Sequence, residues 1–142
     1  FAGLGDHKES DRGGMKELIR RITLPECDIR LWENGILDYD YTLSGEVGIE
    51  LARRAVAAGR ELVTAPCPTL IRINRVAGVT REARLYFSKS EDNQAVVSRV
   101  ALLIDSPLSR LIGNFFIGIN RAQFPTKLFT RLNEAEAWLA AH

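Results

Sequence analysis

The sequence of 142 residues has few of the side chains that most catalytic and metal chemistry requires. Its two cysteines, Cys27 and Cys67, lie far apart and show neither CxxC nor Cys/His ligand spacing, which argues against a metal site and a disulfide. The two histidines are His7 and the final residue, His142, so a Ser/His pair would depend on a chain end. The sequence therefore predicts a protein that is not an enzyme and that holds no metal and no cofactor.

Charge of one sign and long apolar runs are also lacking. With 19 basic and 18 acidic residues the net charge is +1, so no overall field attracts nucleic acid or acidic membranes. No apolar run approaches the length of a membrane span, and no charged segment followed by an apolar stretch marks secretion. Glycine-rich phosphate loops are missing as well. We therefore expect a cytoplasmic protein without nucleic-acid partners or integral membrane association.

Length and composition predict one folded domain. A hydrophobic content of 46% over 142 residues is enough to bury a core. The first 14 residues are polar and rich in glycine, and they precede Met15, the only methionine. We expect residues 1–14 to be a disordered leader or an expression remnant. Residues 15–142 would then form a single α/β domain.

A β-hairpin is predicted near the start of this domain. Apolar and polar residues alternate from Cys27 onward, as in a half-buried strand, and again over residues 36–42. Asn34-Gly35 separates the two runs, and both residues tolerate the positive φ of a type I′ turn. Asp38 and Asp40 alternate with apolar residues on the returning strand. We interpret them as solvated acids on the outer face.

Helices and strands alternate in the rest of the chain. The sequence predicts a helix over residues 45–59, capped by Ser44 and ended by Gly59. The other predicted elements are a strand over 69–76, a helix over 80–90 capped by Thr80, a strand over 95–105, a helix over 107–117 capped by Ser106, a strand over 126–130 and a helix capped by Thr130. Right-handed crossovers make such strands parallel neighbours. The expected fold is a mixed sheet with an N-terminal β-hairpin, followed by alternating helices and mainly parallel strands.

Two stretches carry a resemblance to a known family. The run ALLIDSPLSRLIGNFFIGINRAQFPTKLFTRLNEAEAWL, preceded by TREARLYF, resembles the bacterial SpoIIAA-like proteins of the STAS-like class, and most of all an uncharacterised subgroup. The match extends from about Ile29 to Leu139. It implies a STAS-like fold and a regulatory or adaptor role, with no chemistry attached.

Two positions depart from the family pattern. The subgroup has an acidic residue in the strand before the REAR helix, where this chain has Arg72, which argues against an acidic site there. Anti-sigma antagonists carry a phosphorylated serine at the start of the corresponding helix, where this chain reads GVTREAR. Thr80 would accept a phosphate at a helix N-terminus, but we favour the interpretation that it is an ordinary N-cap.

The helix over residues 107–117 has little charge, and this suggests an interface. Helical projection places one set of residues inward: Leu108, Leu111, Ile112, Phe115, Phe116 and Ile119. Ser109 projects outward, as do four interface candidates: Arg110, Gly113, Asn114 and Ile117. A flat, mildly apolar patch of this kind suits a second copy of the chain, and the alternative is ordinary surface.

A second candidate site lies where the parallel strands end. Ligands of open α/β sheets tend to bind beyond the carboxyl ends of the strands. The residues that this edge would gather are Thr80, Arg81, Arg84, Asp105 and Ser106. Together with two helix N-termini they would bind an anion or a phosphorylated ligand. The alternative is that the arginines are solvated or paired with nearby acids.

The sequence thus favours a domain that acts by binding. The leading interpretation is a homodimeric STAS-like protein that contacts an unknown protein partner in a regulatory or adaptor role. The alternative is a small-ligand domain for a lipid or a nucleotide, because STAS domains share their α/β layering with the CRAL-TRIO lipid carriers. In that case an apolar pocket would open beneath Phe115 and Phe116.

Overall fold

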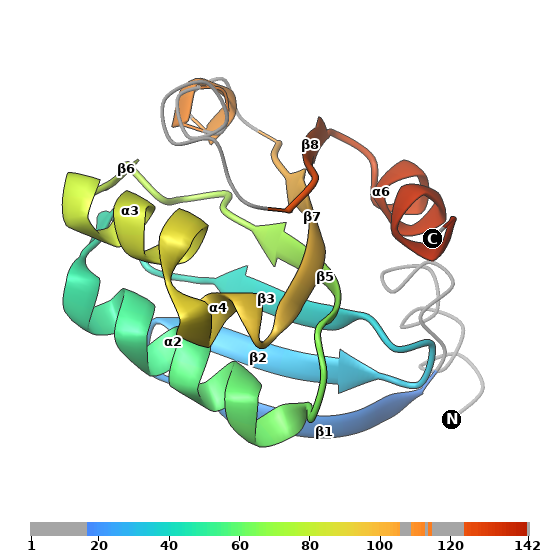
Figure 1. Ribbon diagram of the computed structural model, residues 1–142. Coiled ribbons are helices and arrows are strands. Elements are labelled where there is room, and N and C mark those ends of the chain that lie inside the picture. Colours follow the sequence, from blue (N-terminus) through green and yellow to red (C-terminus); the bar gives the residue numbers. More distant parts are fainter. Residues whose placement is uncertain (1–16, 106–108, 113, 115–123, 142) are drawn as a thin grey trace.

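The computed structural model describes residues 17–105, 109–112, 114 and 124–141 (Figure 1). In these residues a sheet of six strands has the order β1-β2-β3-β5-β7-β8. The strands are β1 (Leu18–Thr23), β2 (Cys27–Trp32), β3 (Leu37–Tyr41), β5 (Cys67–Arg72), β7 (Val97–Leu103) and β8 (Thr126–Phe129). Neighbours from β1 to β3 are antiparallel, and those from β3 to β8 are parallel. The expected mixed sheet is confirmed, while the expected leader over 1–14 lies outside the described residues.

The predicted hairpin is formed by β2 and β3. The predicted type I′ turn is wrong, because only Gly35 has a positive φ, of 88°, and Asn34 does not. The Gly35 N–H donates to Trp32 O at 2.9 Å, so the turn spans residues 32–35 and Gly35 follows its two central residues. The strand before it, β1, was not expected. It pairs antiparallel with β2 at the edge of the sheet, and five of its six residues are exposed. An edge strand with so little burial lacks the apolar alternation by which strands are recognised.

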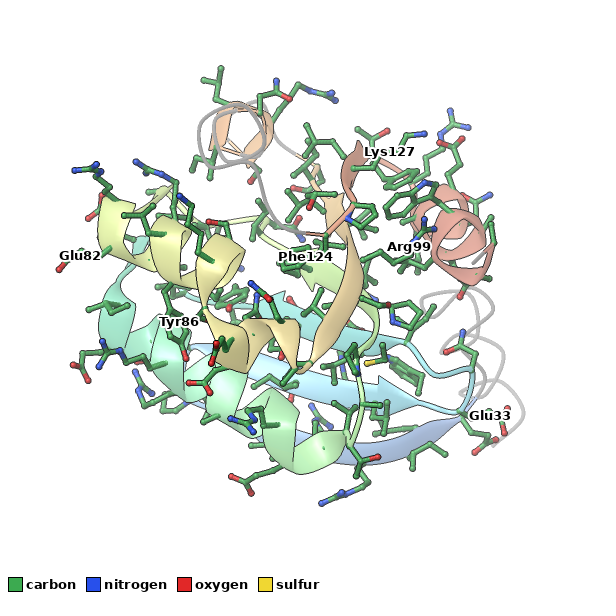
Figure 2. All side chains as sticks on the ribbon, in the orientation of Figure 1. Glu33, Glu82, Tyr86, Arg99, Phe124 and Lys127 are labelled. Carbon is green, nitrogen blue, oxygen red and sulfur yellow. The ribbon has the colours of Figure 1, made fainter. Side chains whose placement is uncertain are left out.

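Helices cover the two faces of the sheet unequally (Figure 1). On one face lie α2 (Ile49–Leu62), α3 (Arg81–Lys89) and α4 (Glu91–Gln94), over an apolar cluster that includes Ile29, Tyr39 and Val100. On the other face α6 (Leu132–Ala140) packs on Leu70 and Ala101. A side chain of β7 anchors α6 there, because Arg99 donates to Trp138 O at 2.6 Å and stacks 4.1 Å from the centroid of the Trp138 ring (Figure 2).

Both predicted ends of the first helix are wrong. Ser44 does not cap it, since Glu46–Val47 forms β4, which pairs in parallel with β6 (Gly78–Val79), and the helix begins only after Gly48. Gly59 does not end it, and the helix continues to Leu62. The glycine serves close packing instead: a Cβ at position 59 would lie 2.1 Å from the hydroxyl oxygen of Tyr39.

The remaining boundaries follow the sequence more closely. The strand expected over 69–76 is β5, which ends at Arg72. Thr80 caps α3 as predicted, and its hydroxyl oxygen accepts a hydrogen bond from Ala83 N at 3.2 Å. The short helix α4 was not predicted. Thr130 is not a cap, since Arg131 holds the N-cap position of α6 without a side-chain bond.

The segment after β7 is helical at residues 109–112 and 114, but its orientation differs from the projection. Ser109, expected outside, is fully buried and donates from its hydroxyl to the carbonyls of Ile73 and Asn74. Leu111, expected inside, is 66% exposed. The Ser109 bonds to the loop after β5 therefore set the rotation of this helix. Ile112 packs against the core, as projected. Six residues in that projection lie outside the described residues: Leu108, Gly113, Phe115, Phe116, Ile117 and Ile119.

Candidate functional site

An apolar cavity lies between the sheet and the helices α2, α3 and α4. Its floor comes from three neighbouring strands, with Tyr39 and Tyr41 of β3, Ile71 of β5, and Val100 and Leu102 of β7 among the lining residues. Side chains on one face of a strand are two residues apart, so these positions necessarily share a surface. The apolar alternation that builds the core thus also builds the cavity floor.

The walls and the opening come from other parts of the chain. Val56 of α2 and Asn93 of α4 form part of the wall, and Phe124, just before β8, also lines the cavity. Figure 2 labels Phe124. Four lining residues are only partly buried, and they mark the rim: Ile71, Val79, Phe87 and Ile112. The rim therefore lies near the carboxyl ends of the strands, where α3 and the 109–112 helix meet.

The size and lining of the cavity decide what it can hold. Its volume is about 60 Å³, and one water needs roughly 10 to 15 Å³ and two or more polar partners. Room for several waters is present, but Val47, Val97 and the other apolar lining side chains offer water no partners. Apolar cavities of this kind stay dry and accept apolar molecules. The cavity is therefore suited to binding an apolar molecule.

Polar side chains also border this apolar site, and those of Thr69 and Asn93 each donate to a backbone carbonyl. The Tyr39 ring lines the cavity, and its hydroxyl, directed at Gly59 of α2, has no hydrogen-bond partner among the described residues. Tyr41 stacks beside it, with ring centroids 6.5 Å apart. Burial raises the pKa of both phenols, so both remain neutral at physiological pH. The sequence indicated an apolar face on this strand, opposite Asp38 and Asp40, but it gave no signal for the space beside the tyrosines.

The opposite face of the sheet carries an ionic cluster, which we define as Arg21, Asp28, Arg30, Asp38, Asp40 and Arg72. The prediction that Asp38 is solvated is wrong, since it is fully buried. Arg72 donates to its two oxygens at 3.1 and 3.2 Å, and Arg30 pairs with it at 3.1 Å. Asp40 is also partly covered, and Arg30 bonds it at 3.4 Å.

The pKa values in the ionic cluster follow from these contacts. Burial alone would raise the pKa of Asp28, but hydrogen bonds from Arg21 (2.9 and 2.7 Å) and Thr23 (2.9 Å), with the charge of Arg30, hold it below its ordinary value. Burial raises the pKa of Asp40 despite the opposing charge of Arg30. Three guanidinium groups face three carboxylates here, so their charges cancel. We interpret the ionic cluster as structural.

Three of the residues predicted for an anion site belong to α3, and a fourth, Asp105, follows β7. Thr80 is engaged as the cap of α3, and Arg81 is exposed on the first turn of that helix. Arg84 is partly buried, and its Nη1 donates to Val79 O at 2.6 Å, which places its guanidinium beside the cavity rim. Asp105 is exposed after β7, and Ser106 lies outside the described residues.

Of the interface candidates, Arg110 and Asn114 are exposed, as the projection predicted, while Gly113 and Ile117 lie outside the described residues. Leu111 joins them on the surface, and its exposure of 66% exceeds that of Leu18 and Ile19. We call Arg110, Leu111 and Asn114 the 110–114 patch. Projection missed Leu111 because it had no information on the buried contacts of Ser109.

Other features bear on chemistry and location. The described residues contain no group of three or more His, Cys, Asp or Glu side chains suited to a metal ion. Burial raises the pKa of the Cys67 thiol to about 11, and it also raises that of Cys27, so neither is an activated nucleophile. Within the same residues, no helix is long and apolar enough to cross a membrane.

The fold and the cavity together define an α/β domain with an internal apolar site. A family model for a domain of unknown function, DUF7793, matches residues 30–142, and the chain belongs to this family. No curated protein matches the chain.

Two solved structures are similar to it. One is an uncharacterised protein of the DUF3478 family with a SpoIIAA-like fold, from Shewanella loihica PV-4, with a TM-score of 0.47 and 15% identity over 87% of this chain and 92% of that one. The other is a protein of unknown function from Arthrobacter sp. FB24, with a TM-score of 0.30 and 28% identity over 80% of this chain and 99% of that one.

Proposed function

We propose that this protein is a non-enzymatic binding domain that takes a small apolar ligand into the cavity. The observation that carries the proposal is the apolar space over β3, β5 and β7, which opens at a partly exposed rim. Small-molecule sites are concave and largely apolar, and they typically measure about 300 to 1,000 Å³. This cavity, at about 60 Å³, therefore has to widen at its partly exposed rim to admit a ligand. Of the two functions considered from the sequence, ligand binding gains support from this apolar site.

The shape of the site favours an extended ligand. Along β5 and the residue that follows it, the lining residues extend from Thr69 to Ile73, a distance of roughly 13 Å at the rise of a β-strand. The long direction of the cavity therefore suits an alkyl chain or a flat aromatic ring. A bulky or highly polar ligand such as a nucleotide fits this lining poorly.

Titration with N-phenyl-1-naphthylamine, a neutral probe that fluoresces in apolar surroundings, tests the proposal. We expect saturable binding with one site per chain. Ile71→Trp enlarges a partly buried rim side chain and should weaken binding at least about tenfold, equivalent to about 1.4 kcal/mol. Leu103→Trp is the matched control: Leu103 is also partly buried near a strand end, but it packs against the α6 face.

Absence of saturable binding by the wild type would refute the ligand-binding function. Equal affinities for the two tryptophan variants would show that the probe binds elsewhere. Circular dichroism and a urea unfolding curve for each variant verify that a loss of binding does not reflect a loss of fold.

A second function is favoured by the 110–114 patch. The exposed Leu111 between two polar neighbours supports self-association, with a regulatory or adaptor role toward an unknown protein partner. Under this proposal light scattering finds a dimer of the wild type, and Leu111→Glu converts it to a folded monomer. Ile19→Glu, at another exposed apolar residue, should leave the dimer intact. A wild type that stays monomeric at high micromolar concentration would contradict it.

A further inference from the structure

A second concavity lies on the outer side of the same helices. Its lining comes from α2 (Arg53, Val56, Ala57, Arg60), α3 (Tyr86) and α4 (Asp92), and we call it the α2–α4 groove. Tyr86 extends from α3 toward α2 in Figure 2. Val56 is only 1% exposed, and it borders both the α2–α4 groove and the apolar cavity. The two spaces are therefore adjacent at this side chain.

The α2–α4 groove has the polarity that the cavity lacks. The guanidinium of Arg53 lies over the Tyr86 ring, 5.9 Å from its centroid. Arg60 pairs with Asp92 at 2.7 Å, and the Tyr86 hydroxyl donates to Asp92 at 3.5 Å. Two guanidinium groups thus face one carboxylate, which leaves an excess of positive charge beside an apolar site.

We infer that the ligand is an anionic amphiphile, with its apolar tail in the cavity and its head group, a carboxylate or similar anion, in the α2–α4 groove. This inference rests on the proposed ligand-binding function and names the class of ligand. Guanidinium groups bind carboxylates through two parallel hydrogen bonds. Arg53 and Arg60 lie two helical turns apart on the same side of α2, so both face the α2–α4 groove.

The Arg60–Asp92 pair does not prevent binding of such a head group. Both side chains are more than half exposed, at 54% and 55%, and exposed ion pairs contribute little to stability. Arg60 can therefore exchange Asp92 for the ligand at small cost. The tail passes Val56, whose side chain must move, so Val56→Ala should widen the passage and speed association of the ligand.

A competing position for the head group exists at the rim. The rim residues themselves are apolar, but Arg84 reaches Val79 O there at 2.6 Å. A ligand that enters tail first through the rim would leave its head group near Arg84. The α2–α4 groove offers two cationic side chains against one at the rim, which decides our choice. Substitution of Arg84 separates the two positions experimentally.

The test compares octanoate and 1-octanol as competitors for the bound neutral naphthylamine probe at pH 8, where octanoate is ionised. In the wild type we expect octanoate to displace the probe at about tenfold lower concentration, the size expected for a charge-assisted hydrogen bond. In Arg53→Gln/Arg60→Gln this preference should disappear, while the affinity for the neutral probe stays unchanged.

Two single variants serve as controls. Arg54→Gln removes a neighbouring charge of α2 that pairs with Glu26 at 3.1 Å, outside the α2–α4 groove, and it should keep the preference for octanoate. Arg84→Gln should keep it as well. These variants separate the effect of the groove from that of total charge.

The outcomes distinguish this inference from the function on which it rests. If the probe does not bind the wild type, the proposed function fails and this inference fails with it. If the probe binds, three results would overturn the inference alone: no displacement by octanoate or octanol, equal displacement by both, or a preference that persists in Arg53→Gln/Arg60→Gln. Loss of the preference in Arg84→Gln would assign the head group to the rim instead.

Discussion

Replacement of Gly59 by alanine tests how closely α2 packs on the sheet. Alanine in a helix interior is more favourable than glycine by about 1 kcal/mol, so propensity alone predicts a more stable protein. The structure predicts the opposite sign. The added Cβ would lie 2.1 Å from the Tyr39 hydroxyl oxygen and 3.2 Å from the ring carbon that bears it. Overpacking of this kind costs about 1 to 3 kcal/mol, which exceeds the gain from propensity.

Tyr39→Phe should reverse this effect. It deletes the oxygen that the new Cβ would meet at 2.1 Å and leaves two milder contacts at 3.2 Å, with the Tyr39 ring carbon and with Val96 Cγ1. By itself the substitution also removes a buried hydroxyl that has no partner among the described residues, so it should be neutral or stabilise the fold by about 1 kcal/mol. When Tyr39→Phe is already present, Gly59→Ala should then cost nothing or stabilise.

The four proteins form a double-mutant cycle, measured by urea unfolding with linear extrapolation. We expect Gly59→Ala to lower the free energy of unfolding in the wild type, with a coupling to Tyr39→Phe of about 1 to 3 kcal/mol. A Gly59→Ala protein at least as stable as the wild type would refute the close packing. A coupling near zero would refute the role of the Tyr39 hydroxyl.

Three further predictions concern buried polar groups. Asp38→Ala leaves the largely buried guanidinium groups of Arg30 and Arg72 without the carboxylate they share. We expect the free energy of unfolding, measured in urea, to fall by about 3 kcal/mol. A decrease below about 1 kcal/mol would contradict the pairing. Because the pKa of Asp28 is lower in the folded state, its stabilising effect is present above the ordinary carboxyl pKa and disappears as the pH falls through the folded value. The stability difference between wild type and Asp28→Asn should therefore be constant near neutral pH and shrink below about pH 4; a difference independent of pH would argue against it. With its pKa raised to about 11, Cys67 should react with iodoacetamide at pH 8 far more slowly in the folded protein than in urea, and equal rates would contradict its burial.

The parts of the fold that depend on local patterns were predictable. Asn34-Gly35 indicates a hairpin, although not its turn type, and Thr80 caps a helix through a bond to a residue three positions away. The prediction that Gly59 ends its helix was wrong for a physical reason. Glycine is common at helix ends, but at this position it is required because Tyr39, on a strand distant in the sequence, packs against it. Short-range rules contain no information on such contacts.

The candidate site was less predictable than the fold. The apolar face of β3 and the end of α3 could be placed from the sequence, but the cavity exists only because β3, α2 and the 109–112 helix line a common space. The rotation of that helix depends on Ser109 and two carbonyls after β5, and this made Leu111 a surface residue. Likewise, Asp38 was read as solvated because its partner Arg72 lies 34 positions along the chain.

The ionic cluster also has a consequence for folding fidelity. A slip of β2 against β3 by two residues would keep every side chain on its own face, so the apolar pattern penalises it little. The same slip would take Arg30 away from its position opposite Asp38, while Arg72 would still hold that carboxylate from the other side. A buried carboxylate shared by three strands thus distinguishes the native alignment from neighbouring misalignments that hydrophobicity alone would allow.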